Sequence, residues 1–157
     1  MKDKIILASR SNVRKNILNE NGINCEVVPS NIDEEEVKNS LVKEGASPIV
    51  VSKNLAELKS IKISKKIPDK IVLGADSVID LEGELISKPK NRKEAYLILQ
   101  KLNGKTHNLI SSVCISKNGS MIWNFTDASS LTMKQLNLDE IKSYLTKIKD
   151  KDRKSVV

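Results

Sequence analysis

A short apolar run that leads directly into a carboxylate is the feature that most constrains this chain. Residues 71–75 are apolar or small, Asp76 and Ser77 follow them, and Lys88 and Pro89 come soon after. Apolar runs of this length that are rich in β-branched residues predict a buried strand. We expect this strand to bring Asp76 to the edge of a sheet, partly removed from water. There the carboxylate can bind Mg²⁺ or accept a proton from water; a strand-end cap is the alternative role.

Hydrophobic periodicity and capping signals predict a mixed β-sheet flanked by helices. Strands are expected over residues 4–8, 25–28, 71–73 with a continuation over 78–81, 106–116 and 121–133, and the pair Asn118-Gly119 is a strong hairpin signal. Helices are expected over residues 13–21, from the acidic run 33–36, from Pro48, over 92–102 and from residue 138. The order of elements mixes βαβ units with hairpins, which favours a mixed sheet with a cleft beside it. A chain of 157 residues is long enough for a single α/β domain, over residues 1–157.

Composition excludes several classes of protein. No apolar run approaches the roughly 20 residues of a membrane span, and no signal peptide is present, so we expect a soluble cytoplasmic protein without a membrane partner. The net charge of +7 suits either nucleic acid or a polyanionic small substrate such as a nucleoside triphosphate. Aromatic residues make up only 3% of the chain, so few rings are available for stacking on bases. Nucleic acid is therefore the less favoured partner.

Histidine and cysteine chemistry is largely ruled out by number and spacing. His107 is the only histidine, so neither a histidine-based triad nor a multi-histidine metal site is available. Cys25 and Cys114 lie far apart and have no neighbour at metal-ligand spacing, which indicates two reduced, buried thiols. Trp123 is expected in the core.

A polar loop between the first strand and the first helix has the ingredients of an anion-binding site. Ser9, Ser11 and Arg14 stand where a strand gives way to a helix, so hydroxyls, cations and free backbone N–H groups can converge on a phosphate. The loop matches neither the Walker pattern nor the Gly-x-Gly-x-x-Gly pattern. A polar turn beside a basic helix face remains the alternative interpretation.

Other charged residues are candidates only in combination. Asp33 and Glu34 can join Asp76, although an acidic run at a helix start is also typical of a solvated cap. Lys59 is placed at the margin of an apolar stripe formed by Val51, Leu55 and Leu58, and Lys88 lies in a loop. In a chain with this many lysines, either one taken alone is more typical of a solvated side chain.

Taken in order, these segments resemble the Maf family of nucleotide pyrophosphatases, also named septum formation inhibitors. The resemblance extends from residue 6 to about residue 149. The motifs that carry it are Leu7-Ala8-Ser9 with Ser11, Arg14 and Leu18; Ile32-Asp33-Glu34; Leu55-Ala56 with Lys59; Gly74-Ala75-Asp76; Lys88-Pro89; and Leu102 with Gly104 and His107. Each motif is weak alone, and the ordered set is specific.

The resemblance implies an α/β fold with a deep nucleotide-binding cleft, a divalent cation (Mg²⁺ or Mn²⁺), and hydrolysis of a nucleoside triphosphate to the monophosphate and pyrophosphate. It implies that Asp76 activates water and that Glu34 and Asp76 serve the metal. Lys59 and Lys88 would act with Asp76 at the reacting phosphate. The residues that it assigns to the triphosphate are Ser9, Arg14, Lys59 and Lys88. Non-standard or pyrimidine nucleotides are the usual substrates of such proteins, and a homodimer is a further expectation.

The sequence departs from the family pattern at two positions and at its C-terminal end. Val13 stands where an arginine or tryptophan is usual, which bears on base selection. Ser77 stands where the members that hydrolyse dTTP and UTP have threonine, and it keeps the hydroxyl. The family continues beyond this sequence into a Gly- and Gln-containing segment that helps close the site. The alternative to an active enzyme is therefore a catalytically impaired nucleotide-binding or regulatory relative.

Overall fold

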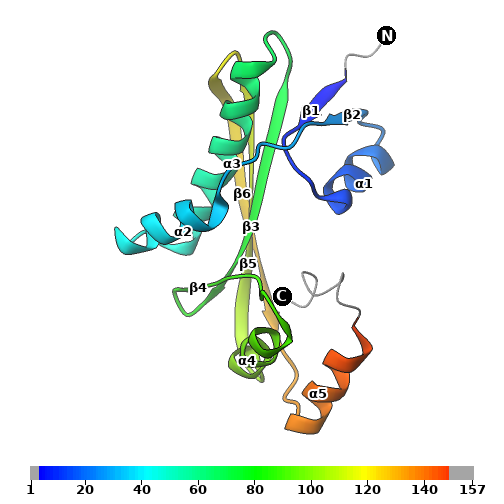
Figure 1. Ribbon diagram of the computed structural model, residues 1–157, viewed down its shortest axis with the longest axis vertical. Helices are drawn as coiled ribbons and strands as arrows, with labels where there is room; N and C mark the ends of the chain where they lie inside the picture. The colour runs from blue at the N-terminus through cyan, green and yellow to red at the C-terminus, as the bar shows by residue number, and fades with distance from the viewer. Residues whose placement is uncertain (1–3, 149–157) are drawn as a thin grey trace. The chain divides into compact units, whose positions relative to one another are not determined.

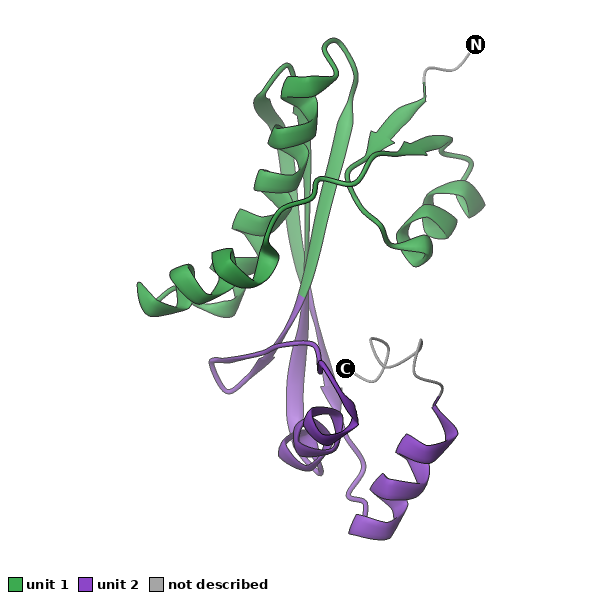
Figure 2. Ribbon diagram, in the orientation of Figure 1, with its two compact units in different colours: residues 1–77, 111–127 green, residues 78–110, 128–157 purple. Residues whose placement is uncertain are grey.

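The computed structural model describes residues 4–148, and their contacts divide them into two compact units (Figure 2). The first unit contains described residues 4–77 and 111–127, and the second contains residues 78–110 and 128–148. Three long strands, β3 (Val72–Leu81), β5 (Thr106–Lys117) and β6 (Ser120–Thr132), contribute residues to both units. The single domain over residues 1–157 stays a prediction.

The described strands form one mixed sheet (Figure 1). Its strand order is β2-β1-β3-β5-β6, and β4 (Glu84–Ile86) pairs with β3 off this path. β1 (Ile5–Leu7) runs parallel to both β2 (Cys25–Val27) and β3, whereas β4 is antiparallel to β3. The predicted mixed sheet with flanking helices is confirmed.

Five described helices begin where the sequence places caps. Those of the first unit are α1 (Asn12–Glu20), α2 (Glu34–Lys43) and α3 (Pro48–Lys66), and those of the second are α4 (Arg92–Leu102) and α5 (Leu138–Lys147). Ser11 caps α1 by accepting a hydrogen bond from the backbone N–H of Arg14. Asp33 caps α2 in the same way, and Asn137 forms a capping box with Glu140 at the start of α5. Within residues 4–148, none of these helices combines the length and apolarity that a bilayer crossing requires.

In the first unit, α3 packs on one face of the sheet. Side chains along β3 alternate in burial, so that Val72, Gly74 and Asp76 are buried on the same face. A Cβ atom on Gly74 would lie 2.3 Å from the backbone oxygen of Ala56 in α3. Glycine therefore permits an approach of strand to helix that any larger residue would prevent. This approach determines how near the side chains of α3 come to β3.

The second unit has apolar clusters of its own. One is formed by buried residues of β3, β4 and α4, namely Ile79, Leu81, Ile86 and Leu102. Another joins α4 to α5 through Ala95, Leu99, Ile141 and Leu145. The guanidinium of Arg92 also donates to the backbone oxygens of Leu145 and Ile148. These contacts secure α5 against α4.

The hairpin predicted at Asn118-Gly119 joins β5 to β6. Both residues have positive φ angles, 49° and 80°. A two-residue turn with positive φ at both positions is the type I′ geometry that matches strand twist. The Asn-Gly signal is therefore confirmed in its physical detail.

Four expectations about burial and strand ends were wrong. Asp76 lies in the middle of β3, an interior strand of the sheet, because Val78, Ile79 and Leu81 continue the same run. The predicted strand-end position at a sheet edge is therefore incorrect. Trp123 is 50% exposed because β6 is an edge strand of the described sheet, and Cys25 is only half-buried. The fourth error concerns which residues form the buried apolar face of α3.

The buried face of α3 is rotated from the predicted one. Leu58 is 42% exposed, whereas Lys59 is 4% exposed and lies between the buried Ala56 and Ile63. The spacing Ala56, Lys59, Ile63 follows one helical face, since residues three and four apart are neighbours on a helix. Lys59 is therefore a core residue of the first unit.

Candidate functional site

The ammonium of Lys59 lies between two carboxylates. Its Nζ atom is 3.0 Å from Oδ1 of Asp76 on β3 and 2.9 Å from Oε1 of Glu34 at the start of α2. It also donates to the backbone oxygen of Ala75 at 3.3 Å. Lys59 and Asp76 are each only 4% exposed, whereas the side chain of Glu34 is 43% exposed. We call Glu34, Lys59 and Asp76 the acidic-lysine group.

Asp76 combines burial with an unused oxygen atom. Its Oδ2 atom is buried and has no hydrogen-bond partner within the described residues. Burial raises the pKa of the Asp76 carboxyl above its ordinary value of 3.8, and the Glu34 charge raises it further. The charge and hydrogen bond of Lys59, and the charge of Lys38, oppose that rise in pKa. A carboxylate with a raised pKa and a free oxygen is suited to accept a proton.

The raised pKa of Asp76 predicts a specific dependence of stability on pH. The folded state retains this proton at pH values where the unfolded chain has released it, so the contribution to stability is greatest below the unfolded pKa. It is lost as pH rises through the folded pKa. We expect the free energy of unfolding of the wild type to fall relative to that of Asp76→Asn as pH rises from about 4 towards neutrality. Urea unfolding of both proteins in metal-free buffer measures this difference, and pH profiles that stay parallel would contradict it.

A buried serine of α3 supports the backbone at Asp76. Ser52 is fully buried, and its hydroxyl donates to the backbone oxygen of Asp76 at 3.2 Å. Sequence reasoning missed this residue, although Ser52 precedes Ala56 by four residues and so shares its helical face. With the close approach at Gly74, this contact fixes β3 to α3 on either side of the carboxylate.

The predicted anion-binding loop is organised around Arg14. The Ser9 hydroxyl accepts from the backbone N–H of Ser11 at 3.1 Å and from Nη1 of Arg14 at 3.4 Å. Nη2 of Arg14 reaches the hydroxyl of Ser77 at 3.5 Å. Ser77 follows Asp76 directly in β3, and its hydroxyl also lies 3.0 Å from that of Ser111 on β5. The loop at the start of α1 is therefore connected to the strand that carries Asp76.

The structure brings most of the sequence-predicted residues together in the first unit. Two connected sets form there, one of Glu34, Lys59 and Asp76 and one of Ser9, Arg14 and Ser77. Val13 is 68% exposed on α1, next to Arg14. Lys88 is an exposed residue of the second unit, between β4 and α4. Its assignment to the triphosphate, like the other residue roles, stays a prediction.

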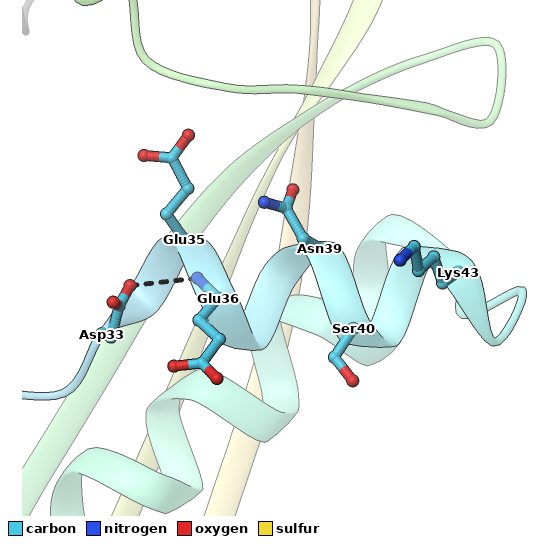
Figure 3. Close-up of a pocket in the computed structure, with 6 residues that line it drawn as sticks. All are labelled: Asp33, Glu35, Glu36, Asn39, Ser40 and Lys43. Atoms are coloured by element: carbon cyan, nitrogen blue, oxygen red, sulfur yellow. Dashed lines mark hydrogen bonds between the residues drawn. The ribbon is translucent and has the colours of Figure 1, made fainter.

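A surface hollow on α2 is lined by residues other than these. It has a volume of about 550 Å³ and is shown in Figure 3. Its lining residues are Asp33, Glu35, Glu36, Asn39, Ser40 and Lys43. No residue of the acidic-lysine group lines the hollow. The Asp33 carboxylate, which does line it, caps α2 by accepting a hydrogen bond from the backbone N–H of Glu36. We therefore place the candidate site at Asp76, and the deep cleft stays a prediction.

The acidic-lysine group fits a divalent cation of the kind held jointly with substrate. Within residues 4–148, no group of three or more His, Cys, Asp or Glu side chains is arranged so that it could hold a metal ion by itself. Mg²⁺ is commonly bound by only one or two carboxylates, with water and substrate phosphates completing its shell. The unpaired Oδ2 of Asp76 and the half-exposed carboxylate of Glu34 provide such oxygens.

Comparison with known proteins agrees with this arrangement. Residues 4–154 match the family model described as Maf-like protein. A nucleoside triphosphate pyrophosphatase of Pelagibacter ubique is 63% identical over 152 residues, which cover 97% of this chain and 78% of that relative. A 7-methyl-GTP pyrophosphatase of Brucella abortus is 35% identical over 147 residues, covering 94% of this chain and 74% of that relative.

A solved structure supports the fold independently. The Ham1 protein of Staphylococcus aureus matches 83% of this chain and 71% of its own with a TM-score of 0.52, at 18% sequence identity. At that identity the similarity concerns the fold alone. Fold and site together define an α/β protein in which a polar loop at the start of α1 contacts the strand that carries a buried carboxylate paired with a lysine. The chain belongs to the Maf-like protein family, as the matched residues and the identity to its relatives show.

Proposed function

We propose that this protein hydrolyses a nucleoside triphosphate to the nucleoside monophosphate and pyrophosphate. The observation that carries the proposal is the buried contact of Asp76 with Lys59, beside an Asp76 oxygen without a partner among the described residues. The relatives from Pelagibacter ubique and Brucella abortus are both named pyrophosphatases of nucleotides. Site geometry and family membership thus support the same reaction.

Asp76 is the proton acceptor in this proposal. Burial raises the pKa of its carboxyl, and a base whose pKa lies nearer the working pH accepts a proton with a greater driving force. Lys59 lowers the pKa of Asp76 and so favours its ionised form, and it holds Oδ1; Oδ2, which has no partner among the described residues, is the atom proposed to accept the proton of water. Proton removal allows that water to attack the α-phosphorus.

Glu34 and Asp76 are the residues that would hold a divalent cation, Mg²⁺ or Mn²⁺. When bound, such a cation offsets the negative charge that develops on the phosphate oxygens. Lys59 contributes to the same end through its own charge. A unit charge at about 4 Å is worth about 4 kcal/mol at an effective dielectric of about 20, before desolvation is subtracted.

The loop of Ser9 and Arg14 is proposed to hold the triphosphate. Its hydroxyls and guanidinium lie at the start of α1, where free backbone N–H groups favour an anion. Lys88 is also proposed to bind the triphosphate. Val13 and Ser77 are proposed to contact the base end of the substrate, with non-standard or pyrimidine nucleotides as the substrate class.

Location and assembly complete the proposal. The two cysteines are unpaired, which suits the reducing cytoplasm. We propose a cytoplasmic enzyme that can form a homodimer, without a nucleic-acid or membrane partner.

The direct test is product analysis with a panel of standard and modified nucleoside triphosphates, each with Mg²⁺ or Mn²⁺. Pyrophosphate and monophosphate should appear in equal amounts, and orthophosphate should not. The nucleotide that turns over fastest identifies the base preference. Orthophosphate as the first product, or no hydrolysis of any nucleotide, would contradict the proposal.

A further inference from the structure

Asn31 connects the loop of Ser9, Arg10 and Arg14, called the phosphate loop below, to Glu34. It lies between β2 and α2 and has a φ of +51°, in the left-handed region that asparagine tolerates better than most residues. Two residues later, Asp33 caps α2, and Glu34 is the first residue of that helix. The direction in which α2 begins, and with it the place of Glu34, therefore depends on the backbone at Asn31.

Side chains from two other segments secure Asn31. The guanidinium of Arg10 donates to its Oδ1 atom, and Nζ of Lys62 on α3 donates to its backbone oxygen at 3.0 Å. Arg10 directly follows Ser9 in the phosphate loop. Lys62 follows Lys59 by three residues on the same helix, α3. Asn31 thus joins the phosphate loop and α3 through polar contacts, and the chain leads from it into α2 three residues later.

These contacts are exposed, but they are not local to one turn of the chain. The Arg10 contact spans 21 residues of sequence and the Lys62 contact spans 31, so neither forms from local geometry alone. Both donors are cations and the acceptors are neutral oxygens, so the bonds are charge-assisted. Such contacts hold their partners at a defined separation.

We propose that Asn31 is a positioning residue that holds Glu34 in register with the Ser9 and Arg14 loop, so that cation and phosphate are bound together. This inference rests on the proposed function of the same site. Its chemical requirement is narrow, because position 31 needs both a tolerated positive φ and a side-chain oxygen that faces Arg10. Glycine meets only the first requirement, and aspartate meets both.

The test compares the affinities of Asn31→Gly and Asn31→Asp for Mn²⁺ together with inorganic pyrophosphate. Calorimetry measures these affinities. Asn31→Gly keeps the backbone conformation and removes the acceptor of Arg10. Mutation of a residue that orients a metal ligand typically lowers metal affinity or activity by about tenfold to a hundredfold. We expect Asn31→Gly to weaken joint binding by about tenfold or more, and Asn31→Asp to retain it.

Asn118→Gly is the matched control. Asn118 also has a positive φ, 49°, and its Oδ1 atom accepts a hydrogen bond from the backbone N–H of Asp69 at 2.7 Å. It lies in the turn between β5 and β6, beside Ser64 near the C-terminal end of α3. The same substitution there should alter thermal stability without changing the affinity for Mn²⁺ and pyrophosphate.

Each outcome separates the inference from the proposed function. Wild-type affinity in Asn31→Gly, or an equal loss in Asn118→Gly, would overturn the positioning role. Selective weakening in Asn31→Gly, with rescue by Asn31→Asp and circular dichroism unchanged, supports it. If that pattern appears while the wild type hydrolyses no nucleotide, the proposed reaction fails and the positioning role stands.

Discussion

Asp76→Asn is expected to reduce pyrophosphate release by about a hundredfold to ten-thousandfold, the usual contribution of a positioned acid or base. The carboxamide has nearly the shape of the carboxylate but cannot accept the proton of the attacking water. Oδ1 can still accept from Lys59, and the buried charge that desolvation disfavours is removed. The variant should therefore fold and lose turnover, as a steady-state pyrophosphate assay and circular dichroism together measure.

Asp80→Asn is the control for this change. Asp80 is on the same strand, and its Oδ1 atom accepts from the backbone N–H of Gly83 at 2.7 Å, a bond that an amide oxygen can also accept. Its activity should equal that of the wild type. Undiminished turnover in Asp76→Asn would remove this residue from the mechanism.

Lys59→Met is expected to damage both stability and activity. The substitution leaves a buried Asp76 carboxylate without its cation and next to the like charge of Glu34. Removing one partner of a buried ion pair typically costs about 3–5 kcal/mol. We expect a loss near the lower end of this range, because Glu34 is partly solvated and Asp76 can bind a proton instead. Urea unfolding at neutral pH measures the loss.

The pH dependence of this loss separates electrostatics from packing. The charge of Lys59 lowers the pKa of Asp76 more than any other group does. Without Lys59 that pKa rises further, so the Asp76 carboxyl keeps its proton to higher pH. The destabilisation should then shrink as pH falls and the carboxyl becomes neutral. Lys53→Met, an exposed site on the same helix, should have little effect. A loss of the same size at acid and neutral pH would contradict the electrostatic account.

Local signals predicted the parts of the site that depend on local geometry. The polar residues between the first strand and the first helix do form a connected loop, because a cap such as Ser11 and the free N–H groups of the helix start lie within a few residues. Asp33 was likewise predicted at a helix start, and it caps α2. The ordered motifs also led directly to the family, which the comparisons confirm.

Tertiary packing determined those parts of the site that local sequence signals did not predict. A carboxylate after an apolar run normally marks a strand end, yet Asp76 lies within β3 because a lysine from α3 offsets its charge. Lys59 was predicted at the margin of the apolar stripe of its helix. Lysine is rarely buried unless it is paired, and the carboxylate of Asp76 on β3 explains its burial here. The contact of Arg10 with Asn31 joins distant segments of the chain and leaves no periodic signal.

The measurement that tests the central claim most directly is hydrolysis in water labelled with heavy oxygen, followed by mass spectrometry of both products. Activation of water by Asp76 at the α-phosphorus predicts that the label enters the nucleoside monophosphate and that pyrophosphate stays unlabelled. Label in the pyrophosphate would show attack at the β-phosphorus, and the proposed arrangement of Asp76, Lys59 and the phosphate loop around the α-phosphorus would then be wrong.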